Sequence, residues 1–467
     1  MSDVDLCFTP ATELAADIRT KRVSPVEVLD AVLDRIDRLN PQLNAFCLMT
    51  ADAARQAAQA AEQAVMRGET LGPLHGVPVS IKDLVITKGV RTMRGSKLYE
   101  RDVPTEDAPV VERLRAAGAI MLGKTTTPEF GFKGVTDSLV TGISRNPWHL
   151  GRTPGGSSGG AGAAVAAGMG PLAVGTDGAG SIRIPSSFCG IYGLKPQVGR
   201  VPVYPASALG DISHAGPMTR TVRDAALMLN VIAGADDRDR FSLPTNHPDY
   251  VRAVEGDIRG LRVAWSPDLG FATVDPQVRQ ITAEAVKAFS ELGCHVEATN
   301  PGFDNPQELF QHLFYVNLRA TLQDYPGYER QIDPQLLANI EEAKDLSAQD
   351  YARSLLRRNT IVDKIRRLFG AYDVLLCPSV AVPPFEALDP LRAEIDKASG
   401  SKKGALTKRL HKVTDALIGG EELSGDDAEL VASVDAKNLE RAREIGNGLL
   451  RDVLERAEGD AAAEQVR

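Results

Sequence analysis

Two short glycine-rich runs contain the residues of this sequence that are best suited to chemistry. The first, residues 155–160, reads Gly-Gly-Ser-Ser-Gly-Gly, and the second, residues 176–185, reads Thr-Asp-Gly-Ala-Gly-Ser-Ile-Arg-Ile-Pro. Glycine serves where the backbone needs a positive φ or must approach a ligand closely, and serine in such a loop presents a hydroxyl without bulky neighbours. A free serine hydroxyl is a poor nucleophile, so a nearby base must take its proton.

Histidine is not expected to be that base, because the chain has seven histidines and none lies in either run. Lys82 is the alternative, since it ends the apolar stretch of residues 76–81. A lysine buried at the end of a strand loses solvation, its pKa falls, and its neutral amine can accept a proton. Taken alone, Lys82 is also compatible with an ordinary solvated lysine at a strand end.

The order of these motifs resembles the amidase signature family, which hydrolyses C–N bonds with a Ser–Ser–Lys triad. The resemblance covers residues 6–384, and it includes the run Gly-Val-Pro-Val-Ser-Ile-Lys-Asp at residues 76–83. It implies that Ser181 is the nucleophile, that Ser157 is a bridging serine in a cis peptide, and that Lys82 accepts the proton through this bridge.

The resemblance also implies an oxyanion hole made of the backbone N–H groups of Gly178, Ala179, Gly180 and Ser181. Donors fixed where negative charge develops are typically worth ~3 kcal/mol each. Ala179 stands where many relatives carry glycine, but its methyl group leaves the amide donor in place.

Three further residues are expected to support the site. Asp177 and Arg183 flank the expected nucleophile, and we expect them to hold the loop through charged hydrogen bonds. Ser158 has two interpretations that the sequence leaves open. It either hydrogen-bonds the bridging serine or caps the alanine-rich helix that follows it.

The acyl pocket is expected, by resemblance, along residues 129–137. Phe130, Gly131 and Phe132 are the tentative substrate-binding residues. The two aromatic side chains would suit an apolar or aryl acyl group, although either is equally compatible with the core. The resemblance implies no metal and no organic cofactor, and the sequence does not identify the amide.

Two other motifs and the cysteines suggest no further chemistry. Residues 118–125 match the P-loop pattern, but their four variable positions, Ala-Ile-Met-Leu, predict a buried strand, and Pro128 disfavours a helix starting at Lys124. Residues 156–160 fit a nucleophile elbow, yet turn-forming residues precede them and no downstream histidine lies in a glycine-rich loop. The five scattered cysteines lack metal-ligand spacing and are interpreted as small buried hydrophobes: Cys7, Cys47, Cys189, Cys294 and Cys377.

Composition limits the partners and the location. The formal net charge of −9 argues against a nucleic acid or an anionic membrane as partner. The chain has no apolar run long enough for a transmembrane helix, and its acidic N-terminus lacks the features of a signal peptide. Together with the unpaired cysteines, these features predict a cytoplasmic protein. The expected partner is a small-molecule amide, and a homodimer is possible.

The elements that position these motifs alternate between strands and helices. Ser24-Pro25-Val26-Glu27 is a capping box at the start of a helix. Strands are expected at 77–81, 120–122, 172–175, 261–265, 295–298 and 373–377, and helices at 50–66, 108–117, 159–168 and 277–291. This pattern predicts an α/β fold, a large mostly parallel (mixed) twisted sheet covered by helices on both faces.

The end of the chain departs from this pattern. The expected domains are an amidase-signature-like α/β domain at residues 1–385 and an atypical helical C-terminal segment at residues 386–467. Amphipathic spacing predicts two helices there, the first through residues 406–417 and the second through residues 439–453. Either a solvated tail or a surface for a partner or a second copy would have this pattern.

The sequence favours a free-standing amidase that hydrolyses a small carboxamide through an acyl-enzyme. An alternative is the amidase subunit of a tRNA-dependent amidotransferase, but those subunits usually carry Met-Asp-Glu-Phe where residues 127–130 read Thr-Pro-Glu-Phe. A catalytically impaired homologue that acts as a binding scaffold is a third hypothesis. An assay against a panel of simple amides would separate them.

Overall fold

The computed structural model describes residues 2–245 and 248–387. Its main sheet has six strands in the order β1-β3-β2-β6-β8-β7. The three central strands β3, β2 and β6 are parallel to one another, and β1 and β8 run antiparallel to their neighbours. The strands are β1 (Phe46–Met49), β2 (Pro78–Lys82), β3 (Ile120–Thr125), β6 (Leu172–Asp177), β7 (Tyr192–Gly193) and β8 (His214–Thr219).

Helices cover both faces of this sheet, as side-chain alternation along β6 shows. Ala173 belongs to a buried cluster that includes α6 (Gly159–Ala166). Its neighbours Leu172 and Val174 belong to the larger buried cluster, which includes α8 (Val222–Ile232). Because successive side chains of a strand point to opposite faces, the sheet lies between these helices. The predicted mixed α/β sheet with helices on both faces is confirmed.

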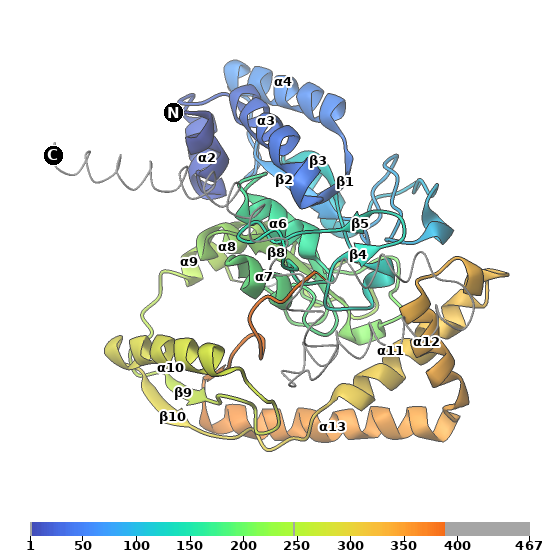
Figure 1. The fold of residues 1–467 in the computed structure, drawn as a ribbon. Helices are drawn as coiled ribbons and strands as arrows, with labels where there is room; N and C mark the ends of the chain where they lie inside the picture. The colour runs from blue at the N-terminus through green and yellow to red at the C-terminus, as the bar shows by residue number, and fades with distance from the viewer. Residues whose placement is uncertain (1, 246–247, 388–467) are drawn as a thin grey trace.

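The strands that follow α8 form a separate parallel sheet in the order β10-β9-β11. They are β9 (Arg262–Trp265), β10 (His295–Ala298) and β11 (Val374–Leu376), and they lie with α10 and α13 at the far end of the molecule from α4 (Figure 1). The sequence predicted these strands but not their separation. Each parallel pairing is closed by its own crossover, β9 to β10 through α10, so the strands satisfy one another without joining the first sheet.

The helix starts follow the local sequence closely. α3 (Pro25–Leu43) begins with the predicted capping box: Ser24 Oγ accepts the Val26 N–H at 2.9 Å, and Glu27 Oε2 accepts the Ser24 N–H at 2.9 Å. The other helices are α1 (Asp3–Phe8), α2 (Ala11–Arg19), α4 (Ala51–Arg67), α5 (Pro109–Ala116), α7 (Arg183–Cys189), α9 (Tyr250–Ala253), α10 (Pro276–Glu291), α11 (Gln307–Leu322), α12 (Pro334–Glu342) and α13 (Ala348–Ala371). In the part of the chain that the structure describes, none of them is long and apolar enough to cross a membrane.

The description ends at residue 387, beside the main sheet's loops. The Thr153 N–H donates to Phe385 O, and the Ala387 N–H donates to Gly151 O. The two helices predicted within residues 386–467 therefore lie outside the described residues.

Candidate active site

Lys82 is the last residue of β2 and is fully buried. Its Nζ donates to three hydroxyl oxygens: Ser157 Oγ at 2.7 Å, Ser158 Oγ at 2.8 Å and Thr176 Oγ1 at 2.9 Å. No ion pair to Lys82 is found within the described residues. Burial therefore lowers the pKa of Lys82 well below its usual value, although the charge of Asp177 opposes this change.

The first glycine-serine run brings its two serines to this lysine. The Gly156–Ser157 peptide is cis, and Ser157 is 2% exposed. Ser158 caps α6 by position, but its side chain makes no capping hydrogen bond; Oγ donates instead to Thr176 O at 3.1 Å. The capping interpretation of Ser158 is therefore wrong, because Lys82 and Thr176 occupy its hydroxyl.

The second run places Ser181 beside the first run. The Ser158 N–H donates to the backbone oxygen of Ser181 at 3.1 Å, so the two loops are directly bonded. Ser181 is half-buried and lines the same cavity as Ser157. Its hydroxyl makes no hydrogen bond to any described residue, so the contact between Ser181 and Ser157 that the resemblance implies is not formed in this structure. The hydroxyl remains available to a molecule in the cavity.

Asp177 holds the loop around Ser181. Its two carboxylate oxygens accept the Gly180 N–H at 2.7 Å and the Ile182 N–H at 3.1 Å. Arg183 adds a bidentate contact, from Nε to Oδ2 at 2.9 Å and from a terminal nitrogen to Oδ1 at 2.8 Å. Burial opposes the charge of Asp177, but the hydrogen bonds and charge of Arg183 prevail and hold its pKa at about 2.

These contacts divide the four backbone N–H groups expected to form an oxyanion hole. The Gly180 N–H donates to Asp177, so it is not available to a substrate in this structure. The N–H groups of Gly178, Ala179 and Ser181 have no hydrogen-bond partner among the described residues. A carboxylate therefore fixes one amide of the bend and leaves three amides unpaired beside the Ser181 hydroxyl.

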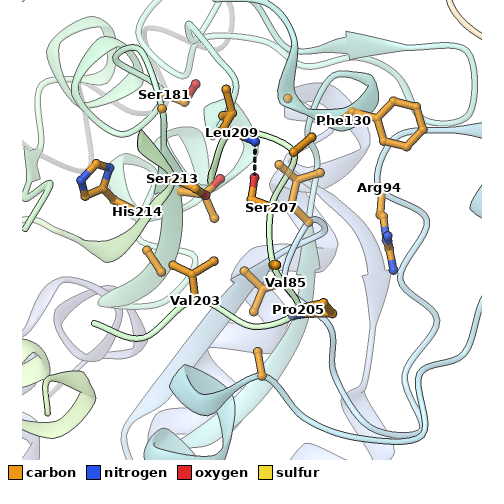
Figure 2. A pocket seen from close by; sticks show the side chains of 18 of the residues that line it. Val85, Arg94, Phe130, Ser181, Val203, Pro205, Ser207, Leu209, Ser213 and His214 are labelled. Carbon is orange, nitrogen blue, oxygen red and sulfur yellow. Dashed lines mark hydrogen bonds between the residues drawn. The ribbon is translucent and has the colours of Figure 1, made fainter. Parts of the chain in front are cut away.

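A cavity of about 220 Å³ opens in front of Ser157 and Ser181. Figure 2 shows Ser181 and His214 on one side of it and Arg94 and Phe130 on the other. The walls also include residues 202–209 and the apolar side chains Phe314, Leu318 and Leu322 of α11. The cavity is thus mostly apolar, with hydroxyl and amide groups gathered at the Ser181 end.

The residues expected at the acyl pocket lie in different surroundings. Phe130 and Gly131 line the cavity, and both have a positive φ, 51° and 73°. Phe132 is 7% exposed and belongs to the buried cluster around Phe314 and Leu336. We therefore assign Phe132 to the core and not to the cavity, because the two left-handed residues before it turn its side chain toward α11 and α12.

Other site residues were not predicted from the sequence. Thr176 binds Lys82 from the neighbouring strand β6, and side-chain alternation next to β2 was the available signal. His214 lines the cavity, and its Nδ1 lies 3.0 Å from the backbone oxygens of Asp177 and Ile212. Burial lowers the pKa of His214. The α11 wall follows from long-range packing and has no local sequence signal.

The motifs that were set aside have structural roles. Lys124 of the P-loop-like run lies in β3 and is fully buried, so no helix follows it to bind phosphate. The prediction of buried cysteines is confirmed for Cys7, Cys189 and Cys294, but Cys47 is half-buried and Cys377 is exposed. Cys377 was mispredicted because it follows the last residue of β11, where the strand leaves its sheet.

Comparison with known proteins identifies the family. A family model described as Amidase matches residues 27–402, which is most of the chain. The chain belongs to the amidase family. It is an enzyme that hydrolyses amide bonds, as the similarity to an acylamidase of Rhodococcus erythropolis also supports. That relative is 42% identical over 396 residues, which cover 84% of this chain and 82% of the relative.

Solved structures of other amidases share the fold. A bacterial aryl acylamidase of the amidase signature family matches with a TM-score of 0.77 and 33% identity, over 81% of each chain. A 6-aminohexanoate cyclic dimer hydrolase, solved with its substrate, matches with a TM-score of 0.75 and 27% identity, over 95% of this chain and 88% of its own. A glutamyl-tRNA(Gln) amidotransferase subunit from Carboxydothermus hydrogenoformans is 35% identical over 411 residues, which cover 82% of this chain and 84% of that protein.

Proposed function

We propose that this amidase cleaves a small carboxamide through an acyl-enzyme on Ser181. The observation that supports this most is the surroundings of Lys82, a buried amine that touches hydroxyls and no carboxylate, one of them belonging to a serine in the same cavity as Ser181. A neutral lysine in such surroundings is a base, and a serine hydroxyl needs a base to become a nucleophile.

In this mechanism, Ser157 carries protons between Lys82 and Ser181. As Ser181 Oγ attacks the carbonyl carbon, its proton passes to Ser157, whose own proton passes to Lys82. The C–N bond then breaks, and the leaving nitrogen receives a proton back along the same path. Water repeats the attack on the acyl-enzyme, which releases the carboxylic acid and restores Ser181. Rotation of the Ser181 hydroxyl toward Ser157 is the adjustment that this step requires, because catalytic hydrogen bonds often form only with substrate bound.

Backbone amides are proposed to stabilise the tetrahedral intermediate. The unpaired N–H groups of Gly178, Ala179 and Ser181 would hold the oxyanion, and Asp177 would keep the bend rigid through the Gly180 and Ile182 amides. Such donors act without reorganisation at the moment of reaction, and each is typically worth ~3 kcal/mol.

The cavity supports an apolar or aryl group on the substrate. Phe130 and the apolar side chains of α11 form its walls, and the only charged side chain among its labelled residues in Figure 2 is Arg94. The acylamidase and aryl acylamidase relatives are consistent with this class. The amidotransferase subunit is the second candidate, because several relatives carry that name. Glutaminase activity of this chain that appears only with partner subunits would favour it.

Covalent labelling tests the proposed nucleophile. A serine-directed phosphonate should modify Ser181 in the parent chain, and peptide mapping by mass spectrometry identifies the modified residue. Ser181→Ala should lose both the modification and the hydrolysis of simple amides while its near-UV circular dichroism remains that of the parent. Modification of Ser157 or Ser158 with Ser181 untouched would refute the assignment.

A further inference from the structure

Glu129 is a buried carboxyl group for which the proposed chemistry has no role. It is 1% exposed and begins the short helical turn η2 (Glu129–Gly131) at the edge of the cavity. Its Oε2 accepts the backbone N–H of Asp333, a residue that is distant in sequence. Its Oε1 has no hydrogen-bond partner in the described part of the chain. A buried charge of this kind is costly unless it holds something in place.

The partner of Glu129 is the start of α12. Asp333 is fully buried and caps this helix, with Oδ1 accepting the Gln335 N–H at 2.9 Å. Lys133 lies between the two segments: its Nζ donates to Asp333 Oδ2 at 3.3 Å and also to Asp137 Oδ1. The charged groups that face Glu129 are therefore Asp333 from α12 and Lys133 from its own segment. The carboxylate of Glu129 ties the cavity turn to the N-terminus of α12, where helix amides favour negative charge.

The other end of the turn touches the proposed proton bridge. A Cβ placed on Gly131 would lie 2.9 Å from Ser157 Oγ and 3.0 Å from Leu84 Cδ1. The backbone of Gly131 therefore lies directly against the Ser157 hydroxyl, with no space for a side chain. The Phe130 N–H donates to Arg94 O at 2.9 Å, which fixes the middle of the turn. A displacement at Glu129 is consequently passed to the wall of Ser157.

Helix α12 also supports the opposite wall of the cavity. Its Leu336 and Ile340 share a buried cluster with Phe314 and Leu318 of α11, and these two α11 side chains reach the cavity. The contact between Glu129 and Asp333 thus joins the two walls between which the substrate must sit.

We propose that Glu129 is a positioning residue for hydrolysis, which ties α12 to the cavity turn and so holds Gly131 against the Ser157 hydroxyl. The inference rests on the proposed role of Ser157. It assigns Glu129 no contact with substrate.

The ionisation of Glu129 makes this role measurable. Burial raises the pKa of Glu129 to about 7, although the Ser96 hydroxyl and the Asp333 amide favour its charged form. The Asp333 carboxylate raises this pKa further, and the charge of Lys133 lowers it. As the pH falls through this value, Glu129 becomes neutral and its attraction to the start of α12 weakens. The acid limb of activity should then contain the ionisation of Glu129 in addition to that of Lys82.

Three variants test the proposal: Glu129→Gln, which keeps an acceptor oxygen, Glu129→Ala, which removes it, and Glu341→Gln as a control. Glu341 is an exposed residue of the same helix, paired with Lys344, so this control makes the same change of charge away from the cavity. The measurements are kcat/KM from about pH 5.5 to 9 for a hydrolysed amide, the rate of phosphonate modification of Ser181, and the Tm.

We expect the parent and Glu341→Gln to lose activity at acid pH more steeply than one proton allows. Glu129→Gln should follow a single-proton limb. At pH 8, Glu129→Ala should lose roughly ten- to a hundredfold in kcat/KM, since small misplacements near the reacting atoms have effects of this size. Glu129→Gln should recover a large part of that loss. Its Tm above pH 7 should not fall, because the substitution removes a buried charge.

Coincident profiles of the parent and Glu129→Gln, with Ser181 modified normally, would overturn this inference alone. A lower Tm of Glu129→Ala with an unchanged kcat/KM of the folded protein would also overturn it, because Glu129 would then be only structural. Modification of another serine in the parent would overturn the proposed function and this inference with it.

Discussion

Two fully buried lysines lie on neighbouring strands of the main sheet, and their surroundings differ. Lys82 ends β2, Lys124 lies in β3, and Lys124 is the register partner of Ile81. Lys82 donates to three hydroxyls. Lys124 donates to Val85 O and to two threonine hydroxyls, and it also lies 4.0 Å from Asp83 Oδ1.

The difference shows that burial alone does not make a base. Burial lowers the pKa of Lys124 only to about 8, because Asp83 supports its charge. Burial raises the pKa of Asp83 to about 6, although Lys124 opposes this. Near neutral pH, Lys124 and Asp83 are therefore charged partners. Lys82 lacks a carboxylate at contact distance within the described residues, and it faces the cavity hydroxyls, so it alone combines a lowered pKa with a proton to accept.

The largest effect is expected from substitution of Lys82. Both Lys82→Ala and Lys82→Arg should lower kcat/KM by about a thousandfold, the range in which loss of a general base falls. Arginine stays charged, so it cannot accept a proton even though it keeps a cation in place. Steady-state kinetics on a hydrolysed amide measures this. Near-parental activity of Lys82→Arg would show that the lysine need not be neutral.

Substitution of Lys124 should instead affect stability. Lys124→Met leaves Asp83 buried without its partner, and breaking a buried pair in this way typically costs about 3 kcal/mol or more. The loss should be smaller at pH 5 than at pH 8, because Asp83 becomes protonated as the pH falls through its raised pKa. Urea unfolding at both pH values measures the effect. Lys124→Met combined with Asp83→Asn should remove most of this pH dependence, and kcat/KM of the folded variants should stay within a few-fold of the parent.

Asp177 provides a smaller test of the Lys82 side. Asp177→Asn keeps the shape of the side chain but weakens the contacts to Arg183 and the bend amides, so kcat/KM should fall by about a hundredfold or less, as for the loss of one oxyanion donor. The folded pKa of Asp177 lies below its ordinary value, so its stabilisation is present above pH 4 and is lost as the pH falls toward 2. It amounts to roughly 2 kcal/mol at neutral pH. The parent should therefore lose more stability than Asp177→Asn between these values. Equal losses would show that the Asp177 contacts do not stabilise the fold.

Sequence reasoning could predict local features but not contacts between distant segments. The buried position of Lys82 followed from the apolar run before it, and the contact between Asp177 and Arg183 followed from their closeness on one loop. The contact of Thr176 with Lys82 depends on the pairing of β2 with β6, which no local pattern gives. The core position of Phe132 likewise depends on α11 and α12, which lie far along the chain.

The pH dependence of phosphonate modification tests the comparison of the two lysines most directly, because it needs no knowledge of the natural amide. In the parent, the rate at Ser181 should fall on the acid side with an apparent pKa well below the ~10.4 of a free lysine. Lys124→Met should show the same profile, and Lys82→Arg should react at the background rate at every pH. An unchanged rate and profile in Lys82→Arg would contradict the role of neutral Lys82 as the base.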